Sequence, residues 1–413
     1  MQPELHVEPN IYMKAFPHFD RPKVIGYIGL ENLKFARRIC NDRVHYDLNL
    51  HLDKAIHQPA DFDVKLTELL KFLLENERRL NYPIEKSLDR AKFFCYRGLL
   101  TCVACTPYEN RESWKIVAIL HKGNIYLCAR DTDDKINRKL NMTDRDKQFT
   151  SWGYKFEQYL LSDEPYSEPN PDVPVDETEE FSLVFTTNLN SHTIVYGAEM
   201  DGLRCDQGPV SKPPTEQGPD EIVNYFNTKQ FIELKTNRHI DHPRQETSFR
   251  RFKSKKWWCQ SFLVGIDTIV CGYRNDDGIV EELRICDVKD LAKKAQRFWN
   301  PNVCFNFLDT FLVYVKRCLA RKVKYKYGEK ALNNLQTLPL VSILFEWQPG
   351  KPVQVSEGYS HEDDPILMPW FLENYDASFN KRLNVRRFGV ALAEQEDQKH
   401  CNGDLTEGHR DDW

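Results

Sequence analysis

The spacing of apolar and polar positions predicts a chain that mixes helices and strands. Between residues 63 and 80, apolar residues recur with helical spacing, and Asp63 is placed to cap that helix. The stretches 93–106 and 114–129 are rich in β-branched and aromatic residues. A turn-like Pro-Tyr-Glu-Asn segment separates the two stretches. The two stretches and this turn predict a β-hairpin. Helical spacing returns at residues 305–315.

The segments without such periodicity predict loops and a tail. Residues 163–180 contain eight acidic side chains, four prolines and no basic residue, so we expect an exposed loop or a path along the surface. Residues 204–221 contain four prolines between two predicted strands, which suggests an insertion. A strand-like pattern occupies 340–347, whereas residues 395–413 are polar and charged, and we expect them to be disordered.

Composition limits the class of protein. The chain has 413 residues, of which 41% are hydrophobic, and this excludes disorder as its overall state. The net charge of −5 excludes a basic coat that binds nucleic acid over the whole surface. We find no apolar run of about 18 residues and no signal-peptide profile, so we expect a soluble, unexported protein without membrane contact. The twelve scattered cysteines favour reduced thiols in the nucleus, the cytoplasm or both.

Two strand-like segments carry the residues with the strongest chemical signal. Residues 194–202 contain Glu199 and Asp201, and residues 231–236 contain Glu233 and Lys235. Residues two apart on a strand share a face, so each pair projects together. If the strands are neighbours, three carboxylates converge and repel one another unless a cation is shared. Hard oxygen ligands of this kind select Mg²⁺ or Mn²⁺.

This acid-x-Lys arrangement is typical of metal-dependent nucleases with a Pro-Asp then Asp/Glu-x-Lys signature. Lys235 could hold the attacking water or the charge of the transition state. The alternative is that Glu233 and Lys235 are solvated strand residues, because Glu-Leu-Lys occurs by chance in many chains. Both segments, however, open with apolar runs typical of buried strands, where unpaired charges are costly.

A basic segment follows the second acidic strand. Residues 229–258 contain nine basic and three acidic side chains, and such a cluster suits an RNA or DNA backbone. Residues 246–265 predict a helix ended by Gly265, with Phe252, Cys259 and Leu263 on one stripe and Lys256 and Gln260 together on another face. The alternative is a solvated basic face with Trp257 and Trp258 packed in the core; we expect at least one of the two there.

Two further charged residues could join the site. Arg97 lies in a strand-like pattern, where it would need an anion, either a phosphate or one of the acids. Glu157 follows a short aromatic segment with helical character, which could equally be an ordinary amphipathic helix. Cys102 and Cys105 lack zinc-like spacing to other cysteines or histidines, and we expect them to pack in the core on opposite faces of a strand.

Six motifs occur in order along the chain: Arg97-Gly-Leu-Leu-Thr, Cys105-Thr-Pro-Tyr-Glu109, Gly153-Tyr-Lys-Phe-Glu157, Glu199-Met-Asp201, Glu233-Leu-Lys235 and Lys256-Trp-Trp-Cys-Gln260-Ser-Phe-Leu. Together they resemble the decapping exoribonuclease family, which includes the fungal partners of the nuclear 5′-to-3′ exoribonuclease. The similarity extends from about Arg21 to Gly350. It departs at Gly202, where many relatives have cysteine. The resemblance implies a mixed α/β fold, a single large domain with two sheets flanked by helices and a nuclease-like core.

The resemblance also implies roles for individual residues. Metal ligands would be Glu157, Glu199, Asp201, Glu233 and the backbone carbonyl of Leu234, which would hold Mg²⁺ or Mn²⁺ as two ions. Catalytic residues would be Glu199, Asp201, Glu233, Lys235 and Gln260, and substrate-binding residues would be Arg97, Glu157, Lys235, Lys256 and Gln260. We expect the domain to span residues 21–390, with an N-terminal extension over 1–20 and a tail over 391–413.

The implied activity is RNA 5′-end quality control. The family hydrolyses the first phosphodiester to remove a triphosphate, an unmethylated cap or an NAD cap, and many members then degrade the RNA from its 5′ end. We expect a monomer that binds single-stranded RNA 5′ ends, with a 5′-to-3′ exoribonuclease as a candidate partner. Two alternatives stay open: a catalytically weak protein that binds RNA 5′ ends or scaffolds an exonuclease, and a DNA nuclease.

Overall fold

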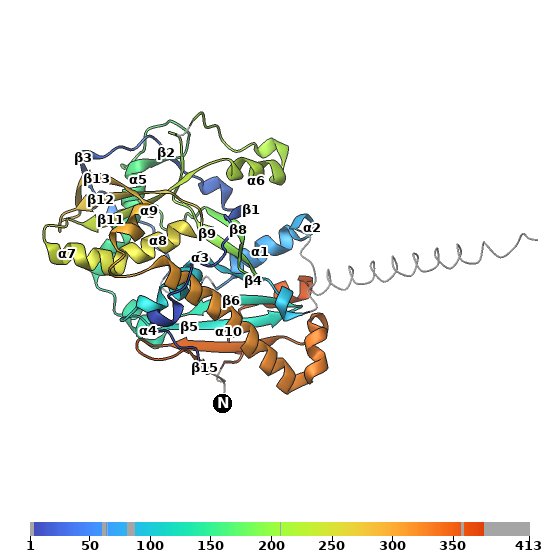
Figure 1. Cartoon of the computed structure of the whole chain (residues 1–413). Helices are drawn as coiled ribbons and strands as arrows, with labels where there is room; N and C mark the ends of the chain where they lie inside the picture. Colours follow the sequence, from blue (N-terminus) through green and yellow to red (C-terminus); the bar gives the residue numbers. More distant parts are fainter. Residues whose placement is uncertain are drawn as a thin grey trace, which may run out of the picture.

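The computed structural model describes residues 4–59, 63, 65–80, 87–206, 208–356 and 359–375. Within these residues the strands form two sheets (Figure 1). The first sheet has the spatial order β1 (Lys23–Ile28), β8 (Ser182–Leu189), β9 (His192–Glu199), β4 (Phe93–Tyr96), β6 (Asn124–Arg130), β5 (Trp114–His121), β14 (Val341–Trp347) and β15 (Gln354–Ser356). The second has the order β3 (Asp42–Asp47), β13 (Ile279–Asp287), β12 (Thr268–Arg274), β11 (Phe231–Arg238), β10 (Gly202–Arg204), β2 (Phe35–Ala36) and β7 (Leu161–Ser162).

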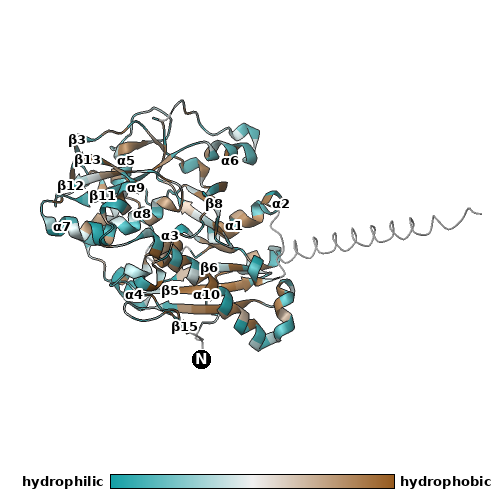
Figure 2. Ribbon diagram, in the orientation of Figure 1, coloured by the Kyte–Doolittle hydropathy of each residue, from teal (hydrophilic) through white to brown (hydrophobic). Residues whose placement is uncertain are grey.

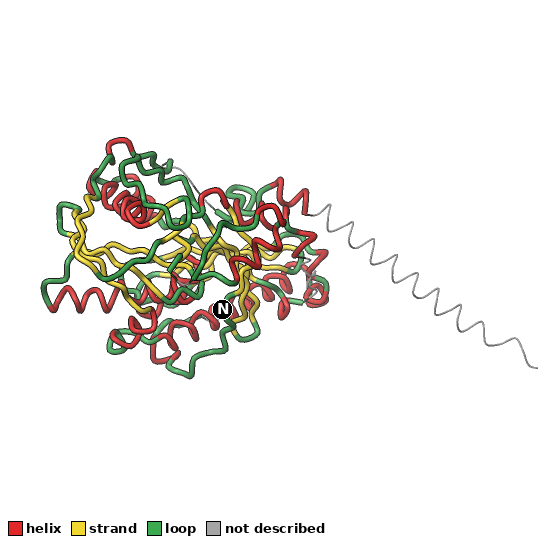
Figure 3. The backbone as a smooth tube through the Cα atoms, turned by 90° about the horizontal axis from the view of Figure 1, so that it is seen from above, coloured by secondary structure: helices red, strands yellow, loops and turns green. Residues whose placement is uncertain are grey.

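Helices cover these sheets on several sides, as the view from above shows (Figure 3). They are α1 (Thr67–Glu75), α2 (Glu77–Leu80), α3 (Arg97–Cys105), α4 (Asp133–Leu140), α5 (Asp144–Leu160), α6 (Pro219–Asn227), α7 (Pro243–Ser248), α8 (Ser254–Phe262), α9 (Val288–Lys294) and α10 (Pro301–Tyr327), with a π-helical turn at Phe249–Lys253. The predicted mixed α/β fold with two sheets flanked by helices is confirmed.

Alternation along the strands gives each sheet two apolar faces. In β4, Phe93 faces a central core that also contains residues of α3, α8 and α10, whereas Phe94 faces a cluster under α1. In β12, Ile269 faces the same central core, whereas Val270 packs with the apolar side of α5. The order of layers is therefore α1, first sheet, central helices, second sheet and α5. The strands near α10 are largely hydrophobic (Figure 2).

The helix expected over residues 63–80 is shorter and starts later. It divides into α1 and α2, and Leu66, not Asp63, precedes the first turn. Asp63 instead pairs with Arg130 at 2.6 Å. The predicted cap was wrong, because the carboxylate of Asp63 forms an ion pair with an arginine on β6.

The hairpin expected over residues 93–129 was wrong in its first half. The chain leaves β4 after Tyr96 and forms α3, in which Leu99, Leu100 and Val103 are buried at helical spacing. Residues 114–130 alone make the hairpin, β5 and β6. Arg97 is therefore the first residue of a helix and not part of a strand. The strand argument for Cys102 and Cys105 also fails, because both lie on α3, where Cys102 is exposed and Cys105 is buried.

The basic helix is interrupted by a π-helical turn. α7, the turn 249–253 and α8 follow one another, and Gly265 just beyond has φ +70°, as a left-handed helix-ending glycine requires. The π turn adds a residue and rotates the helix, so Phe252 is only half-buried while Cys259 and Leu263 are buried as expected. Trp257 and Trp258 are both buried, which confirms that at least one packs in the core.

The two expected loops are largely irregular but not wholly on the surface. In 163–180, Val175 and Glu177 are buried, and Ser151 donates a 2.5 Å hydrogen bond to Glu177. In 204–221, helix α6 begins at Pro219, so a helix and not a strand follows this segment. The tail at 391–413 lies outside the described residues. No helix of the described chain is long and apolar enough to cross a membrane.

Candidate active site

The chain passes from the first sheet to the second at the acidic motif. β9 ends at Glu199, and β10, in the other sheet, begins at Gly202, so Asp201 lies in the connection between them. β10 pairs antiparallel with β11, with Gly202 opposite Ile232. The two acidic segments are neighbours as expected, but through β10 and not through β9.

Backbone pairing continues into a side-chain contact at Asp201. Its Oδ2 accepts a 2.6 Å hydrogen bond from the backbone N–H of Leu234. Gly202 leaves space for Leu161, because a Cβ at this glycine would lie 2.4 Å from Leu161 Cδ2. Gly202 is thus matched by a leucine on β7.

Glu233 is the most enclosed acid of the group. Its side chain is 1% exposed, lies 3.4 Å from the Arg97 guanidinium through Oε2, and forms an ion pair with Lys235 through Oε1. Burial alone would raise the pKa of Glu233, but the charges of Lys235 and Arg97 lower it below the ordinary value. The pKa of Lys235 is raised, because Glu233 and Asp201 outweigh the effect of burial.

Glu157 lies near the end of α5, the helix that packs on the face of the second sheet opposite to the central core. Its neighbour Phe156 packs against Gly272 of β12, where an added Cβ would lie 2.4 Å from the ring. The contact sets the height of the helix over the sheet. Burial, then the negative charges of Asp201 and Glu199, raise the pKa of Glu157 well above its ordinary value.

Glu199 and Asp201 share the effect of crowding. Glu199 is an exposed residue, yet desolvation of its carboxyl group by the surrounding protein, together with the negative charges of Glu180 and Asp201, raises its pKa to about 7. Burial and the charge of Glu233 raise the pKa of Asp201 to about 6. Glu180 was missed from the sequence. No sequence signal marked it, because its approach to Glu199 depends on the register of β8 with β9, which places Ser182 opposite Glu199.

Gln260 and Lys256 lie one turn apart on α8, on the partly exposed side of that helix. Between them and the core, Cys259 is fully buried and its Sγ lies 3.7 Å from that of Cys105 on α3. This packing holds α8 on the helix that Arg97 begins. Lys256 forms ion pairs with Glu109 at 3.5 Å and Glu112 at 3.4 Å.

The donor chemistry of the site suits a hard divalent cation. The negative charges of Glu157, Glu199 and Asp201 act on one another, which is the repulsion that a shared cation relieves. As the side chains stand, no three His, Cys, Asp or Glu residues of the described chain are arranged to coordinate an ion together. Both oxygens of Glu233 are engaged by Lys235 and Arg97. Coordination by all four acids therefore requires side-chain movement, above all at Glu233.

Most of the chain is similar in sequence to decapping and exoribonuclease proteins of animals. The human decapping and exoribonuclease protein is 30% identical over 389 residues, which covers 90% of this chain and 89% of that protein. The decapping and exoribonuclease protein Rai1 of Drosophila melanogaster is 31% identical over 327 residues, covering 75% of this chain and 83% of the relative.

Structural comparison supports the same fold. Candida albicans Rai1, solved in complex with pU5-Mn²⁺, has a TM-score of 0.70 at 17% identity and covers 91% of this chain and 99% of its own. Scheffersomyces stipitis Rai1, solved with (3′-NADP)⁺ and a calcium ion, has a TM-score of 0.67 at 15% identity, with coverage of 91% and 99%. A family model described as RAI1 like PD-(D/E)XK nuclease matches residues 20–372. The chain therefore belongs to the RAI1-like PD-(D/E)XK nuclease family, whose members are divalent-metal-dependent enzymes.

Proposed function

We propose that this chain is an RNA 5′-end quality-control hydrolase. It removes triphosphate, unmethylated-cap and NAD-cap ends by hydrolysing the first phosphodiester, and then degrades 5′-monophosphate RNA distributively. One observation carries the proposal: four carboxylates from α5, the end of β9, the β9–β10 connection and β11 gather around Lys235 and Arg97. The relatives at about 30% identity, named decapping and exoribonuclease proteins, support the substrate class.

Each residue has a role that follows from its position. Glu157, Glu199, Asp201 and Glu233, with the carbonyl of Leu234, would hold Mg²⁺ or Mn²⁺, as two ions. Bound ions of this type polarise a phosphoryl oxygen and lower the pKa of a water. Lys235, kept protonated by Glu233, presents a fixed positive charge to the substrate phosphate. Gln260 can orient a water or a phosphate oxygen through its amide, and Arg97 restrains Glu233.

We propose a nuclear or cytoplasmic setting for this chain. All eleven cysteines of the described residues are free, which suits the nucleus or the cytoplasm. We propose a monomer that binds single-stranded RNA 5′ ends, with a 5′-to-3′ exoribonuclease as a candidate partner.

Turnover by a double variant tests the proposal. Wild type and the variant Glu199→Ala with Asp201→Ala are given short RNAs with 5′-triphosphate, unmethylated-cap, NAD-cap and 5′-monophosphate ends, each with Mg²⁺ or Mn²⁺. Asp163→Asn, an 82% exposed acid on the surface, is the matched control. Loss of turnover in the double variant alone supports the site. Unchanged turnover, with folding verified by circular dichroism, would overturn it.

A further inference from the structure

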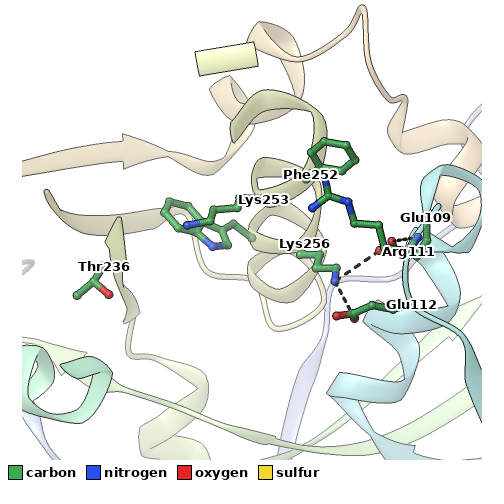
Figure 4. A pocket seen from close by; sticks show the side chains of 8 residues that line it. Glu109, Arg111, Glu112, Thr236, Phe252, Lys253 and Lys256 are labelled. Atoms are coloured by element: carbon green, nitrogen blue, oxygen red, sulfur yellow. Dashed lines mark hydrogen bonds and ion pairs between the residues drawn. The ribbon is translucent and has the colours of Figure 1, made fainter. Parts of the chain in front are cut away.

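Beside the acidic site, α8 and the segment that follows α3 enclose a pocket of about 260 Å³. Its lining residues are Glu109, Arg111, Glu112, Thr236, Phe252, Lys253, Lys256 and Trp257. Figure 4 shows Lys256 between the two glutamates and the guanidinium of Arg111 against the ring of Phe252. The volume is just below that of usual small-molecule sites, and suits part of a nucleotide.

The positive charges of this pocket are not fully neutralised. Glu109 and Glu112 both pair with Lys256, and Glu112 also contacts Arg138 at 3.4 Å. In the described part of the chain, no carboxylate lies within ion-pair distance of Arg111 or Lys253. The two carboxylates thus pair with Lys256, and Glu112 also with Arg138, whereas the cationic groups of Arg111 and Lys253 are available to an anion.

Two arginines of this region, Arg111 and Arg251, contact the ring of Phe252. The guanidinium of Arg111 lies 4.6 Å from the centroid of Phe252, and that of Arg251 lies 5.2 Å from the same ring. Cation–π contacts orient a guanidinium without neutralising it. Phe252 takes this position because the π-helical turn moves it off the buried stripe of the helix. Phe252 is therefore a positioning residue for positive charge.

Lys253 contacts β11, the strand that carries Glu233 and Lys235. Its ammonium donates a 2.7 Å hydrogen bond to Asn237 Oδ1, and Asn237 is two residues beyond Lys235 on β11. Two residues along a strand span about 7 Å and return to the same face. The ammonium of Lys253 therefore lies beside the residue that follows Lys235 on the same face of β11.

We propose that Arg111, Lys253 and Lys256 form a subsite for the backbone phosphates of single-stranded RNA next to the scissile position, on the 3′ side. The inference rests on the proposed function and extends it to a determinant of substrate length. The 3′ side is favoured because Arg111 and Lys253 are exposed, so the pocket opens to solvent, where a continuing chain needs an exit. Single-strand phosphate contacts release counterions with a slope of about 0.7 per contact, so the subsite also sets salt dependence.

A substitution at Glu112 should change KM in the opposite direction from substitutions at Arg111 and Lys253. Its exposed carboxylate competes with phosphate for Lys256. Glu112→Gln should therefore lower KM for long RNA, whereas Arg111→Gln with Lys253→Gln should raise it. A purely structural role of these residues predicts no such opposition.

The experiment compares kcat/KM for a 5′-triphosphorylated dinucleotide and decanucleotide of the same 5′ sequence over a series of salt concentrations. Wild type should prefer the decanucleotide. Arg111→Gln/Lys253→Gln should remove most of that preference and lower the slope of log KM against log salt by about 1.4, with the dinucleotide rate unchanged. Phe252→Ala should have a smaller effect in the same direction. Lys326→Gln and Tyr325→Ala, exposed residues at the end of α10, are the matched controls.

Several outcomes would overturn the subsite. They are a wild type without length preference, a preference that survives in the double variant, an equal loss for the dinucleotide, or an equal effect in the controls. Absence of turnover for either RNA in wild type would instead contradict the proposed function itself, so the two failures are distinguishable.

Discussion

Asp201 accepts a 2.6 Å hydrogen bond from the backbone N–H of Leu234, so the connection between the two sheets is tied to the strand that carries Glu233 and Lys235. The contact gives Asp201 a structural function through Oδ2, and the proposed function assigns its charge a second one as a metal ligand. An asparagine can accept the same hydrogen bond but carries no charge, and the two functions can therefore be separated.

Asp201→Asn should keep the fold and lose activity. We expect its free energy of unfolding to stay within about 1 kcal/mol of wild type, because one hydrogen bond is conserved. Turnover of 5′-triphosphate RNA should fall by at least about 100-fold, since several kcal/mol of charge stabilisation depend on the ligand set. Urea unfolding and initial rates measure the two effects. A stable variant with near-normal rates would show that this carboxylate is dispensable.

Arg97→Met should affect both stability and rate. The buried Glu233 loses one of two cationic partners, and we expect a loss of about 1–3 kcal/mol in the free energy of unfolding. The rate should fall as well, because Glu233 is no longer restrained beside Lys235. Arg130→Met is the control: Arg130 pairs with Asp63 and Asp364 away from the site, so its loss should cost stability alone. Equal rate effects in both variants would contradict the assignment.

Metal binding should stabilise the protein more as pH rises from about 5.5 to 7.5. The pKa values of Glu199 and Asp201 are raised to about 7 and about 6 by burial and by neighbouring negative charge. A carboxyl group whose folded pKa is raised favours the folded state below its ordinary pKa, and this contribution is lost as pH rises through the folded pKa. The metal-free protein is then weakened by repulsion, which Mn²⁺ relieves.

Thermal melting with and without Mn²⁺ at several pH values measures this dependence. The increase in Tm caused by Mn²⁺ should grow with pH in wild type and be largely absent in Glu199→Gln/Asp201→Asn. A pH-independent increase of the same size in both proteins would point to metal binding elsewhere.

Gly272→Ala should disturb the site from a distance. The new methyl group would lie 2.4 Å from the ring of Phe156, and α5, with Glu157, must shift outward. Overpacking of this kind costs about 1–3 kcal/mol, and we expect a lower apparent affinity for Mn²⁺. Gly153→Ala on the same helix meets nothing within 4 Å and should be neutral or stabilising. Unaltered Mn²⁺ affinity in Gly272→Ala would show that Glu157 does not depend on this contact.

Local patterns predicted the elements in which regular apolar spacing persists along most of the element. α10 and β14 appear where apolar spacing placed them, as does the strand around Glu233. α3 was mistaken for a strand, because a short run of Leu, Cys, Val and Ala suits either state and packing between the sheets decides.

The candidate site was predictable only as a set of residue types. Chain order indicated Glu199, Asp201, Glu233 and Lys235, yet it placed Glu199 and Asp201 on one strand, whereas the chain changes sheets between them. The contribution of Glu180 depends on the register of β8 with β9, and the position of Phe252 depends on a π-helical turn. Both are long-range or irregular features that spacing alone does not encode.

The most direct test of the central claim is hydrolysis of 5′-triphosphate RNA by the purified chain in ¹⁸O-labelled water, with products identified by mass spectrometry. The account predicts a metal-dependent reaction that releases the 5′-terminal nucleoside triphosphate and leaves RNA shortened by one nucleotide, whose new 5′-monophosphate carries the label, and none of either product with Asp201→Asn. Intact RNA after prolonged incubation with Mg²⁺ or Mn²⁺, or equal product from Asp201→Asn, would contradict it.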